Sequence, residues 1–451
     1  MLMQVEGSKA VADTIALCRP EVICAYPISP QTHIVEALSR IVKAGGLESC
    51  EYLNVESEFA AMSASIGASA TGARTYTATA SQGLLFMVEA LYNASGLGLP
   101  IVMTVANRAI GAPINIWNDH SDSMSQRDSG WVQLYASSNQ EAVDLHIQAF
   151  RLAEQVSLPV MVCVDGFILT HAYERIDLPD QQLVDNFLPA FQPVQALDPA
   201  APISIGAMVG PEAFTEVRYV MHARHMQVLD AVPRIAAEFA EAFGRDSGGL
   251  VRHYRTESAD TVIVALGSVL GTIQDVIDEL RDAGHNVGAL GITCFRPWPR
   301  EELRAALAGA SRVVVLEKAF AVGAGSIVGG ELRLALADTP TEVHDVIAGL
   351  GGRSITKASL HVLLETAMAG GLGPLTFLDL DRDLVERELE RMGTVGNAAD
   401  AADSANYTSR ALRELVTVGA AEFTPTIAAE DDHAVAAAIP EVASPTITAD
   451  R

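Results

Sequence analysis

The stretch RTYTATASQGLLFMVEALYNASGLGLPIVMTVA (residues 74–106) contains the pattern that decides the fold. RTYTATA (74–80) is rich in β-branched residues and predicts a strand, residues 84–95 predict a helix, and PIVMTVA (100–106) predicts a second strand. Strands that are apolar at nearly every position are typical of parallel sheets, because helices cover both faces of such sheets. The stretch therefore predicts an α/β domain built around a parallel sheet.

The same alternation continues on both sides of this unit. It predicts strands at 21–26, 51–55 and 158–166 and helices at 30–42, 58–70 and 140–156. From residue 176 to about 249, prolines interrupt the pattern before a predicted helix at 232–243, and GGL (248–250) indicates a domain boundary. We therefore expect a first domain over residues 1–247.

A second α/β pattern begins at DTVIVALGS (260–268). It predicts further strands at 286–292 and 312–318 and helices at 271–283, 300–307, 330–337 and 358–368. We expect this second α/β domain to cover residues 248–391. From residue 392 to 451 the composition shifts to Ala, Asp, Glu, Thr and Pro, which predicts an acidic, Ala-rich, disordered tail.

Composition and charge restrict the class of protein. The chain has 451 residues, of which 49% are hydrophobic and 19% charged, so large buried cores are possible. A net charge of −26 argues against a nucleic-acid partner, because phosphate binding needs a basic surface. The N-terminus lacks a secretory signal pattern, and no apolar run reaches the ~20 residues that span a bilayer. We therefore expect a cytoplasmic protein that is not bound to a membrane.

The five cysteines do not form a recognisable ligand set. None belongs to a CxxC pair, and Cys24 and Cys163 lie within predicted strands. This placement predicts buried thiols rather than ligands of an iron–sulfur cluster. We assign no metal ligands to the chain from its sequence.

A proline-braced turn, YPISPQT (26–32), follows the first predicted strand. Its pattern predicts Ser29 as the N-cap of the next helix and Pro30 as its first residue. A helix N-terminus with a free hydroxyl can bind a carboxylate, while plain helix capping is the alternative.

Glu58 lies in VESEFAAM (55–62), where it opens a predicted helix of small residues. Such a helix can be approached closely by a large, flat group, which would then meet the carboxylate. The alternative is that Glu56 and Glu58 only favour the helix N-terminus through the macrodipole, an effect of ~0.3–1 kcal/mol.

The segment 106–128, ANRAIGAPINIWNDHSDSMSQRD, is a long polar loop after a predicted strand. Long ordered loops of this kind are usually functional. Arg108 can bind a carboxylate through two parallel hydrogen bonds. Asp119 and His120 together are compatible with a metal or acid–base pair, but the spacing favours a structural role.

Several motifs together resemble the alpha subunit of the pyruvate:ferredoxin oxidoreductases, a branch of the 2-oxoacid:ferredoxin oxidoreductase family. The similar stretches are YPISPQT (26–32), VESEFAAM (55–62), TASQGLLFM (79–87), residues 106–131, DGFILTH (165–171), GSVLGT (267–272), FRPWP (295–299) and AGLGGR (348–353). They occur in the family's order and cover about residues 1–370.

The resemblance implies that thiamine diphosphate binds between a pyrimidine-type domain of this chain and a diphosphate-binding domain of another subunit. It also implies that the second domain resembles the family's transketolase C-terminal-like domain. Glu58 corresponds to the catalytic glutamate that hydrogen-bonds the aminopyrimidine ring, and Tyr26, Pro27 and Gln82 fall in cofactor-binding motifs. Ser29 and Arg108 correspond to substrate contacts.

The function that the resemblance implies is the conversion of pyruvate, CoA and oxidised ferredoxin into acetyl-CoA, CO2 and reduced ferredoxin. The sequence has neither the GDG…N signature for Mg²⁺ and diphosphate nor a cluster-binding cysteine set. Mg²⁺ is therefore expected on a beta subunit, and [4Fe–4S] clusters on beta, gamma or delta subunits.

Alternatives stay open at this point. Residues 317–325 depart from the pattern of the pyruvate enzymes, so the substrate can instead be phenylglyoxylate or a branched-chain 2-oxo acid. The chain can also be half of a non-oxidative thiamine diphosphate enzyme, or a catalytically silent scaffold that kept the fold. The presence of Glu58, Ser29 and Arg108 argues against a silent scaffold.

Overall fold

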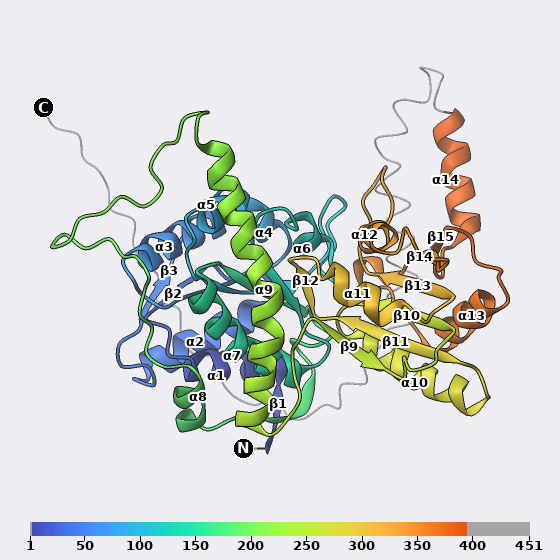
Figure 1. The fold of residues 1–451 in the computed structure, drawn as a ribbon, viewed down its shortest axis with the longest axis horizontal. Coiled ribbons are helices and arrows are strands. Elements are labelled where there is room, and N and C mark those ends of the chain that lie inside the picture. Colours follow the sequence, from blue (N-terminus) through green and yellow to red (C-terminus); the bar gives the residue numbers. More distant parts are fainter. Residues whose placement is uncertain (1, 395–451) are drawn as a thin grey trace, which may run out of the picture. The chain divides into compact units, whose positions relative to one another are not determined.

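Two largely parallel sheets organise the chain (Figure 1). The structure is a computed structural model that describes residues 2–394. The chain divides into one unit up to Asp379 and a second that starts at Leu380, within which α14 (Arg382–Thr394) is a helix. Apart from the last residues of α14, the predicted tail from residue 392 onward lies outside the described residues.

The first sheet has seven strands in the order β12-β6-β7-β5-β4-β2-β3. Its strands are β2 (Val22–Ala25), β3 (Glu51–Asn54), β4 (Thr75–Thr79), β5 (Val102–Asn107), β6 (Val132–Tyr135), β7 (Val160–Asp165) and β12 (Cys294–Arg296). Every neighbouring pair is parallel except β12 and β6. The four strands from β4 to β7 are buried at every position, which explains their apolar and β-branched composition.

Helices cover both faces of the first sheet, as Figure 1 shows, with α3, α4 and α5 on one face and α1, α2 and α7 on the other. The helices of this region are α1 (Gly7–Leu17), α2 (Thr32–Lys43), α3 (Glu58–Ala70), α4 (Ser81–Phe86), α5 (Val88–Gly96), α6 (Ser121–Ser125), α7 (Asn139–Val156), α8 (Gln181–Phe187) and α9 (Phe214–Phe243). A short antiparallel pair, β1 (Leu2–Glu6) with β8 (Tyr173–Asp177), lies outside the sheet.

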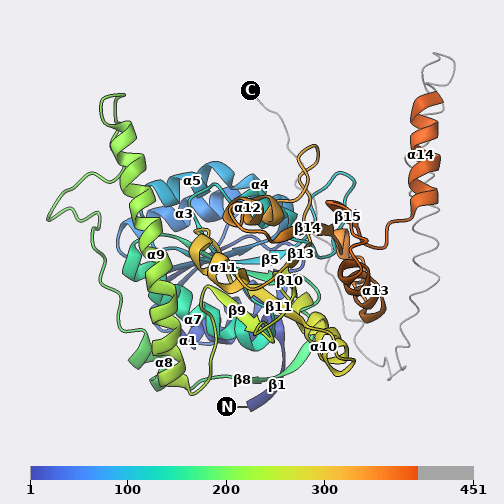
Figure 2. The same cartoon turned by 45° about the vertical axis from the view of Figure 1, so that its right-hand side comes forward.

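The second sheet has six strands in the order β15-β14-β13-β10-β11-β9 (Figure 2). Its strands are β9 (Val251–Tyr254), β10 (Thr261–Ala265), β11 (Val287–Ile292), β13 (Arg312–Glu317), β14 (Glu342–Ile347) and β15 (Leu375–Phe377). Its helices are α10 (Val269–Asp282), α11 (Arg300–Leu307), α12 (Val328–Ala335) and α13 (Lys357–Met368). Only β9, at the edge, runs antiparallel to its neighbour.

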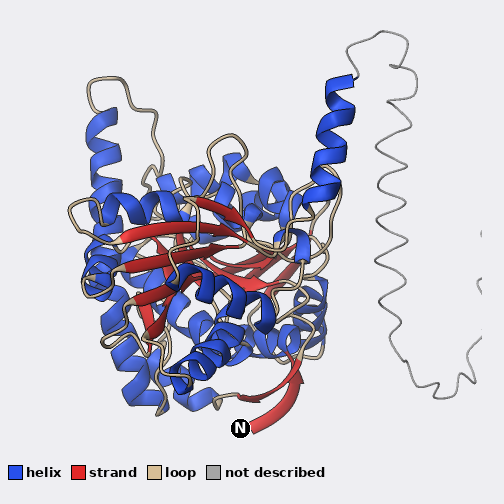
Figure 3. Ribbon diagram, turned by 90° about the vertical axis from the view of Figure 1, so that its right-hand side faces the viewer, coloured by secondary structure: helices blue, strands red, loops and turns tan. Residues whose placement is uncertain are grey.

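The hydrophobic core is continuous between the two sheets, whose strands are coloured red in Figure 3. One apolar cluster contains Leu84 and Leu91 from α4 and α5, Val264 from β10 and Leu303 from α11. Other clusters fill the opposite faces, between the first sheet and α1, α2, α7 and α9, and between the second sheet and α10 and α13. The shared cluster explains why both sheets belong to one compact unit.

Most predicted elements are present, and two are corrected. The predicted helix at 84–95 is two helices, α4 and α5, which meet at Met87. The helix predicted at 232–243 begins much earlier, at Phe214, and contains Pro233. The buried residues of α9 begin only at Val228, and the apolar side chains Phe214, Val217 and Val220 in its first half are exposed.

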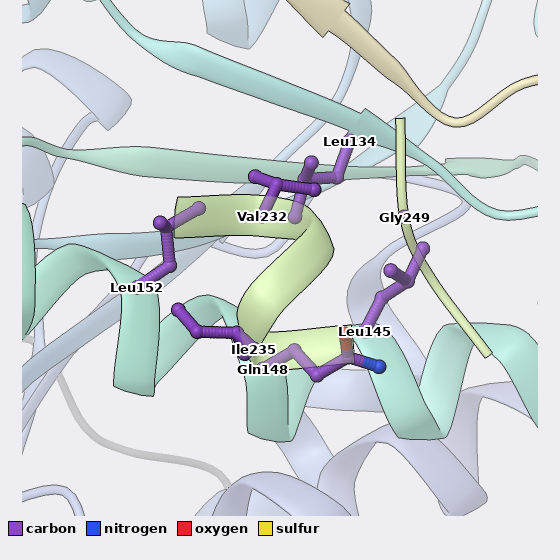
Figure 4. A pocket seen from close by; sticks show the side chains of 7 residues that line it. All are labelled: Leu134, Leu145, Gln148, Leu152, Val232, Ile235 and Gly249. Carbon is purple, nitrogen blue, oxygen red and sulfur yellow. The ribbon is translucent and has the colours of Figure 1, made fainter. Parts of the chain in front are cut away.

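A small cavity lies in the core between β6, α7 and α9 (Figure 4). Its lining residues are Leu134, Leu145, Gln148, Leu152, Val232, Ile235 and Gly249. Its volume of about 10 Å³ is no more than one water molecule needs. Gln148 donates from Nε2 to the Ser247 carbonyl at 3.2 Å, so its polar end is engaged. We interpret the cavity as a packing void.

Candidate active site

The predicted site residues follow the carboxyl ends of adjacent parallel strands, where sheets of this type bind ligands. The turn with Tyr26 and Ser29 follows β2, and Glu58 follows β3. Gln82 follows β4, and Arg108 follows β5. Since these strands are neighbours and point the same way, their loops meet at one edge of the sheet.

Glu58 is the first residue of α3, whose N-cap Ser57 accepts a hydrogen bond from the Ala60 N–H at 3.2 Å. The Glu58 side chain is only 8% exposed. Within the described residues, its carboxylate has no hydrogen bond or ion pair, although buried carboxylates are normally paired. The macrodipole of α3 favours the charge but supplies no direct donor, so the carboxylate is free to accept one from a ligand.

Gly83 packs directly against this carboxylate. A Cβ atom on Gly83 would lie 2.6 Å from Glu58 Oε1 and 2.6 Å from Thr79 Oγ1, closer than any real contact. The Thr79 hydroxyl is also buried, and it has no hydrogen-bond partner in the part of the chain that the structure describes. A carboxylate and a hydroxyl that are free to pair in this way fit a ring with its own N–H groups.

The turn after β2 is built differently from the prediction. Gln31 N–H donates to the Ile28 carbonyl at 2.9 Å and closes a β-turn, so α2 begins at Thr32 with Gln31 as its N-cap residue. The predicted N-cap role of Ser29 is therefore wrong, because the Ser29–Pro30 pair occupies the centre of this turn. Ser29 is exposed, and its hydroxyl makes no hydrogen bond within the described residues.

Gln31 fixes this turn to the sheet. Its Nε2 donates to the carbonyls of Tyr26 and Ala78, each at 2.9 Å, and thereby joins the ends of β2 and β4. Tyr26 is half-buried and Pro27 is exposed at the same edge. Gln31 thus fixes the backbone of this turn to the sheet, while the side chains of Tyr26 and Pro27 remain partly or fully exposed.

Arg108 is brought next to Ser29. Its Nη1 donates to the Ser29 carbonyl at 2.9 Å and its Nε to the Asn115 carbonyl at 3.3 Å. Arg108 is 7% exposed, and no carboxylate pairs with it within the described residues. Burial lowers the pKa of the guanidinium, and Asp122 opposes this effect. A buried cation without a counter-ion is suited to bind an anion.

Asp122, which the sequence reasoning did not single out, supports both loops. Its carboxylate accepts hydrogen bonds from the N–H groups of Ser81 at 2.9 Å and Arg108 at 3.0 Å, and from Asn107 Nδ2 at 2.8 Å. Burial raises the pKa of Asp122 to about 6 despite these donors. Gln82, next to Ser81, is half-buried, and its Nε2 lies 2.8 Å from where a Gly111 Cβ would be.

The long loop after β5 is held by a glycine loop of the second sheet. Asn115 Nδ2 donates to the Gly351 carbonyl at 3.1 Å, and Gly351 N–H donates to Asp119 Oδ2 at 3.0 Å. Gly351 has a positive φ of 59° and approaches Asn115 so closely that a side chain would clash. The segment AGLGGR (348–353) therefore fixes the position of the loop that carries Arg108.

A buried ionic cluster lies beneath this loop. His120 Nε2 lies 2.6 Å from Asp165 Oδ1, and Lys318 Nζ donates to Asp165 Oδ2 at 2.8 Å. These three side chains are 2%, 1% and 4% exposed, respectively. Burial acts to raise the pKa of Asp165, but Lys318 and His120 outweigh it and hold the pKa well below its ordinary value. These contacts support the structural interpretation of His120.

Comparison with protein families finds two matches in the chain. Residues 14–236 match the model described as pyruvate flavodoxin/ferredoxin oxidoreductase, thiamine diphosphate-binding. Residues 259–360 match pyruvate:ferredoxin oxidoreductase core domain II. The thiamine diphosphate-binding match contains all the predicted cofactor and substrate residues.

Named relatives extend the similarity over most of the chain. Pyruvate synthase subunit PorA of Methanosarcina barkeri is 47% identical over 393 residues, 85% of this chain and 98% of the relative. PorA of Methanocaldococcus jannaschii is 49% identical, covering 80% and 93% of the two chains. Ketoisovalerate oxidoreductase subunit VorA of Pyrococcus horikoshii is 41% identical, covering 80% and 92%.

A solved structure shares the fold at low sequence identity. The 2-oxoglutarate:ferredoxin oxidoreductase of Magnetococcus marinus gives a TM-score of 0.61 at 19% identity. The match covers 81% of this chain and 65% of that chain, so this chain spans less than two thirds of its length. With the family matches, it confirms the predicted fold class, a thiamine diphosphate-binding parallel-sheet domain followed by a second α/β domain.

Proposed function

The chain belongs to the family of pyruvate:ferredoxin oxidoreductase alpha subunits, and from this premise we propose that it serves as the alpha subunit of such an enzyme. The proposed reaction converts pyruvate, CoA and oxidised ferredoxin into acetyl-CoA, CO2 and reduced ferredoxin. One observation carries the assignment of roles: at the same edge of one sheet, the buried carboxylate of Glu58 and the buried guanidinium of Arg108 each lack an oppositely charged partner within the described residues.

Thiamine diphosphate, when bound, supplies a nucleophilic carbon and an electron sink for decarboxylation. Glu58 would accept a hydrogen bond from a ring nitrogen of the cofactor and orient that ring. Tyr26, Pro27 and Gln82 would border the same ring.

Substrate binding falls to the neighbouring loop. Arg108 would donate to the carboxylate of the 2-oxo acid, with its position fixed by Ser29 O and Asn115 O. The free hydroxyl of Ser29 would donate a further hydrogen bond to the substrate. Burial of the guanidinium strengthens its attraction for an anion, because little water remains to screen it.

The remaining chemistry is assigned to partner subunits. We place the Mg²⁺ and diphosphate contacts on a beta subunit and the [4Fe–4S] clusters on beta, gamma or delta subunits, with ferredoxin as acceptor and CoA as co-substrate. The five cysteines support this division, since all are free thiols and four are buried. Burial raises the pKa of Cys24, which disfavours the thiolate that a metal cluster needs.

Two further assignments also remain proposals. We keep the domain limits 1–247 and 248–391, and we propose a cytoplasmic location. Within the described residues, no helix combines the length and apolar character that crossing a membrane requires.

A second substrate deserves a direct test, because VorA relatives are 40–41% identical to this chain, close to the 43–49% of the PorA relatives. The alternative function is therefore oxidation of a branched-chain 2-oxo acid such as ketoisovalerate, by the same chemistry.

The test is to purify the native complex that contains this chain and to screen 2-oxo acids with CoA and a low-potential electron acceptor. We expect the highest kcat/KM with pyruvate, and strict dependence on CoA. A preference for ketoisovalerate would establish the alternative. Absence of any CoA-dependent oxidation in an intact complex that contains thiamine diphosphate would contradict both.

A further inference from the structure

Three side chains from separate parts of the chain meet on the surface beside the turn after β2. They are Glu6 at the end of β1, His33 in the first turn of α2, and His171 in the loop after β7. Each offers one ligand atom, and these atoms all lie within 4.8 Å of one another. No other group of three or more His, Cys, Asp or Glu side chains in residues 2–394 meets this condition.

The two imidazoles face each other and are already oriented. Their ring centroids are 4.7 Å apart. His33 Nδ1 lies 2.7 Å from Glu6 Oε1, and His171 Nδ1 lies 2.7 Å from the Thr170 hydroxyl. Nε2 of each ring has no hydrogen-bond partner within the described residues, and neither does the second oxygen of Glu6. The contact of His171 with Thr170 matches the usual arrangement of a metal-binding histidine, in which an oxygen outside the ligand set engages the second ring nitrogen.

The spacing suits a small divalent ion. Zn²⁺ binds His nitrogen and carboxylate oxygen at about 2.0–2.2 Å, so tetrahedral ligand atoms lie about 3.4 Å apart. Ligand atoms that are 4.8 Å apart must come about 1.4 Å closer to reach this separation, and side-chain rotation can supply that movement. The His33 side chain is 51% exposed and is therefore free to make it. Two histidines and one carboxylate are also a ligand set that leaves a coordination position open.

Space for that open position is present on the surface. A depression of about 390 Å³ is bordered by Glu6 and His33 and also by Lys9, Glu36 and Arg40. Lys9 is engaged by Asp13, which offsets part of the positive charge near the cluster. Water or a small anion can reach an ion bound to Glu6 and His33 from this side.

We propose that Glu6, His33 and His171 form a binding site for a late first-row divalent metal ion, with Zn²⁺ as the preferred ion. The site joins the start of α1, the start of α2 and the loop after β7. The ring centroid of His171 lies 4.8 Å from that of Phe167, and the Phe167 centroid lies 5.0 Å from that of Trp117. The bound ion thereby stabilises the packing behind the loop that carries Arg108.

The test uses the full chain without a histidine tag, freed of metal by a chelator and titrated with Zn²⁺ in a calorimeter. Co²⁺ replaces Zn²⁺ in a parallel titration followed by visible absorption. The variants are His33→Ala, His171→Ala and Glu6→Gln, and His285→Ala is the matched control because it removes an exposed histidine elsewhere. His33 is exposed, so its removal leaves the core intact even if His171→Ala fails to fold.

We expect one Zn²⁺ per wild-type chain and per His285→Ala chain, with affinity at least about tenfold weaker after loss of any one ligand. Tetrahedral Co²⁺ absorption should disappear in the same variants. The proposal is overturned if the wild type shows no saturable binding, or if the His33→Ala and Glu6→Gln variants bind as tightly as the control. Because the readout is metal binding, the result does not depend on the proposed enzymatic function.

Discussion

Two groups of buried ionisable side chains lie at the end of the first sheet and differ in one respect. The first consists of His120, Asp165 and Lys318, and the second of Glu58 and Arg108. In the first group, the Lys318 ammonium lies 2.8 Å from the Asp165 carboxylate, and His120 Nε2 lies 2.6 Å from the same carboxylate. Glu58 and Arg108 are nearly as buried, yet neither has a charged partner within the described residues. The charges of the first group are paired within the described chain, and we propose that ligands supply the partners of Glu58 and Arg108.

We propose that this difference separates residues that stabilise the fold from residues that bind the cofactor and the substrate. A buried charge without a partner is costly, so it persists only where a ligand or partner supplies the missing interaction. Substitutions in the group of His120, Asp165 and Lys318 should lower the stability of the fold. Substitutions of Glu58 or Arg108 should lower activity and have little effect on stability.

The largest effect is expected from Glu58→Gln in the assembled complex. The amide cannot replace the charged acceptor, so turnover should fall by ~10²–10⁴-fold, the range for positioned acid–base groups. The thermal midpoint should stay the same, because no protein group loses a partner. Steady-state kinetics and thermal unfolding of Glu58→Gln and of the exposed control Glu56→Gln check this. Activity near that of the control would remove Glu58 from the mechanism.

Lys318→Met should show the opposite behaviour. It leaves Asp165 buried without its lysine partner, and removing one member of a buried pair costs about 3–5 kcal/mol of unfolding free energy. Urea unfolding of the full chain measures this, with Lys357→Met as control, since Lys357 pairs with Glu279 on the surface. Equal midpoints for the two variants would show that the group of His120, Asp165 and Lys318 does not stabilise the fold.

Arg108→Lys should have a smaller effect, confined to substrate binding. Lysine keeps the charge but loses the second hydrogen bond of the fork, so KM for the 2-oxo acid should rise roughly 10-fold while kcat changes little. Arg127→Lys, in the same loop segment, is the control. An unchanged KM would mean that another residue binds the substrate carboxylate.

The smallest effect concerns Asp122, which lies between the two groups. Its pKa is raised to about 6, above the unfolded value, so between about pH 4 and 6 the folded state binds more protons than the unfolded state. Its contribution to stability therefore falls as pH rises through this window. From pH 5 to 7 the decrease should be on the order of 1 kcal/mol, and Asp122→Asn should remove it.

Urea unfolding at pH 5 and pH 7 measures this slope in wild type, in Asp122→Asn and in the exposed control Asp246→Asn. Retention of the full slope in Asp122→Asn would assign the proton uptake to another group.

Much of the fold could be predicted because periodicity reflects burial. Helix α3 begins and ends as predicted, since Ser57 caps it and small residues face the sheet. The first half of α9 could not be predicted because its large apolar side chains, such as Phe214 and Tyr219, are exposed and do not line a buried face. Ser29 was misplaced because a Ser-Pro pair suits both a helix start and a β-turn.

The site was predictable only within single segments. Glu58 and Arg108 stand out locally, as a carboxylate at a helix start and an arginine in a long loop. The partners of Asp165 could not be inferred, because His120 is 45 residues away and Lys318 is 153 residues away in the sequence. Nothing in the local pattern around Asp122 indicates that it anchors two different loops.

The pairing of β12 with β6 has a consequence for how the chain is made. Strand β6 (Val132–Tyr135) is synthesised long before β12 (Cys294–Arg296), so the growing chain carries an open sheet edge while residues 136–293 are translated. An open edge can pair with another nascent chain, which makes this interval a period of aggregation risk for the cell. Production of soluble protein should therefore depend on slow expression or on chaperones that shield this edge until residue 296 has left the ribosome.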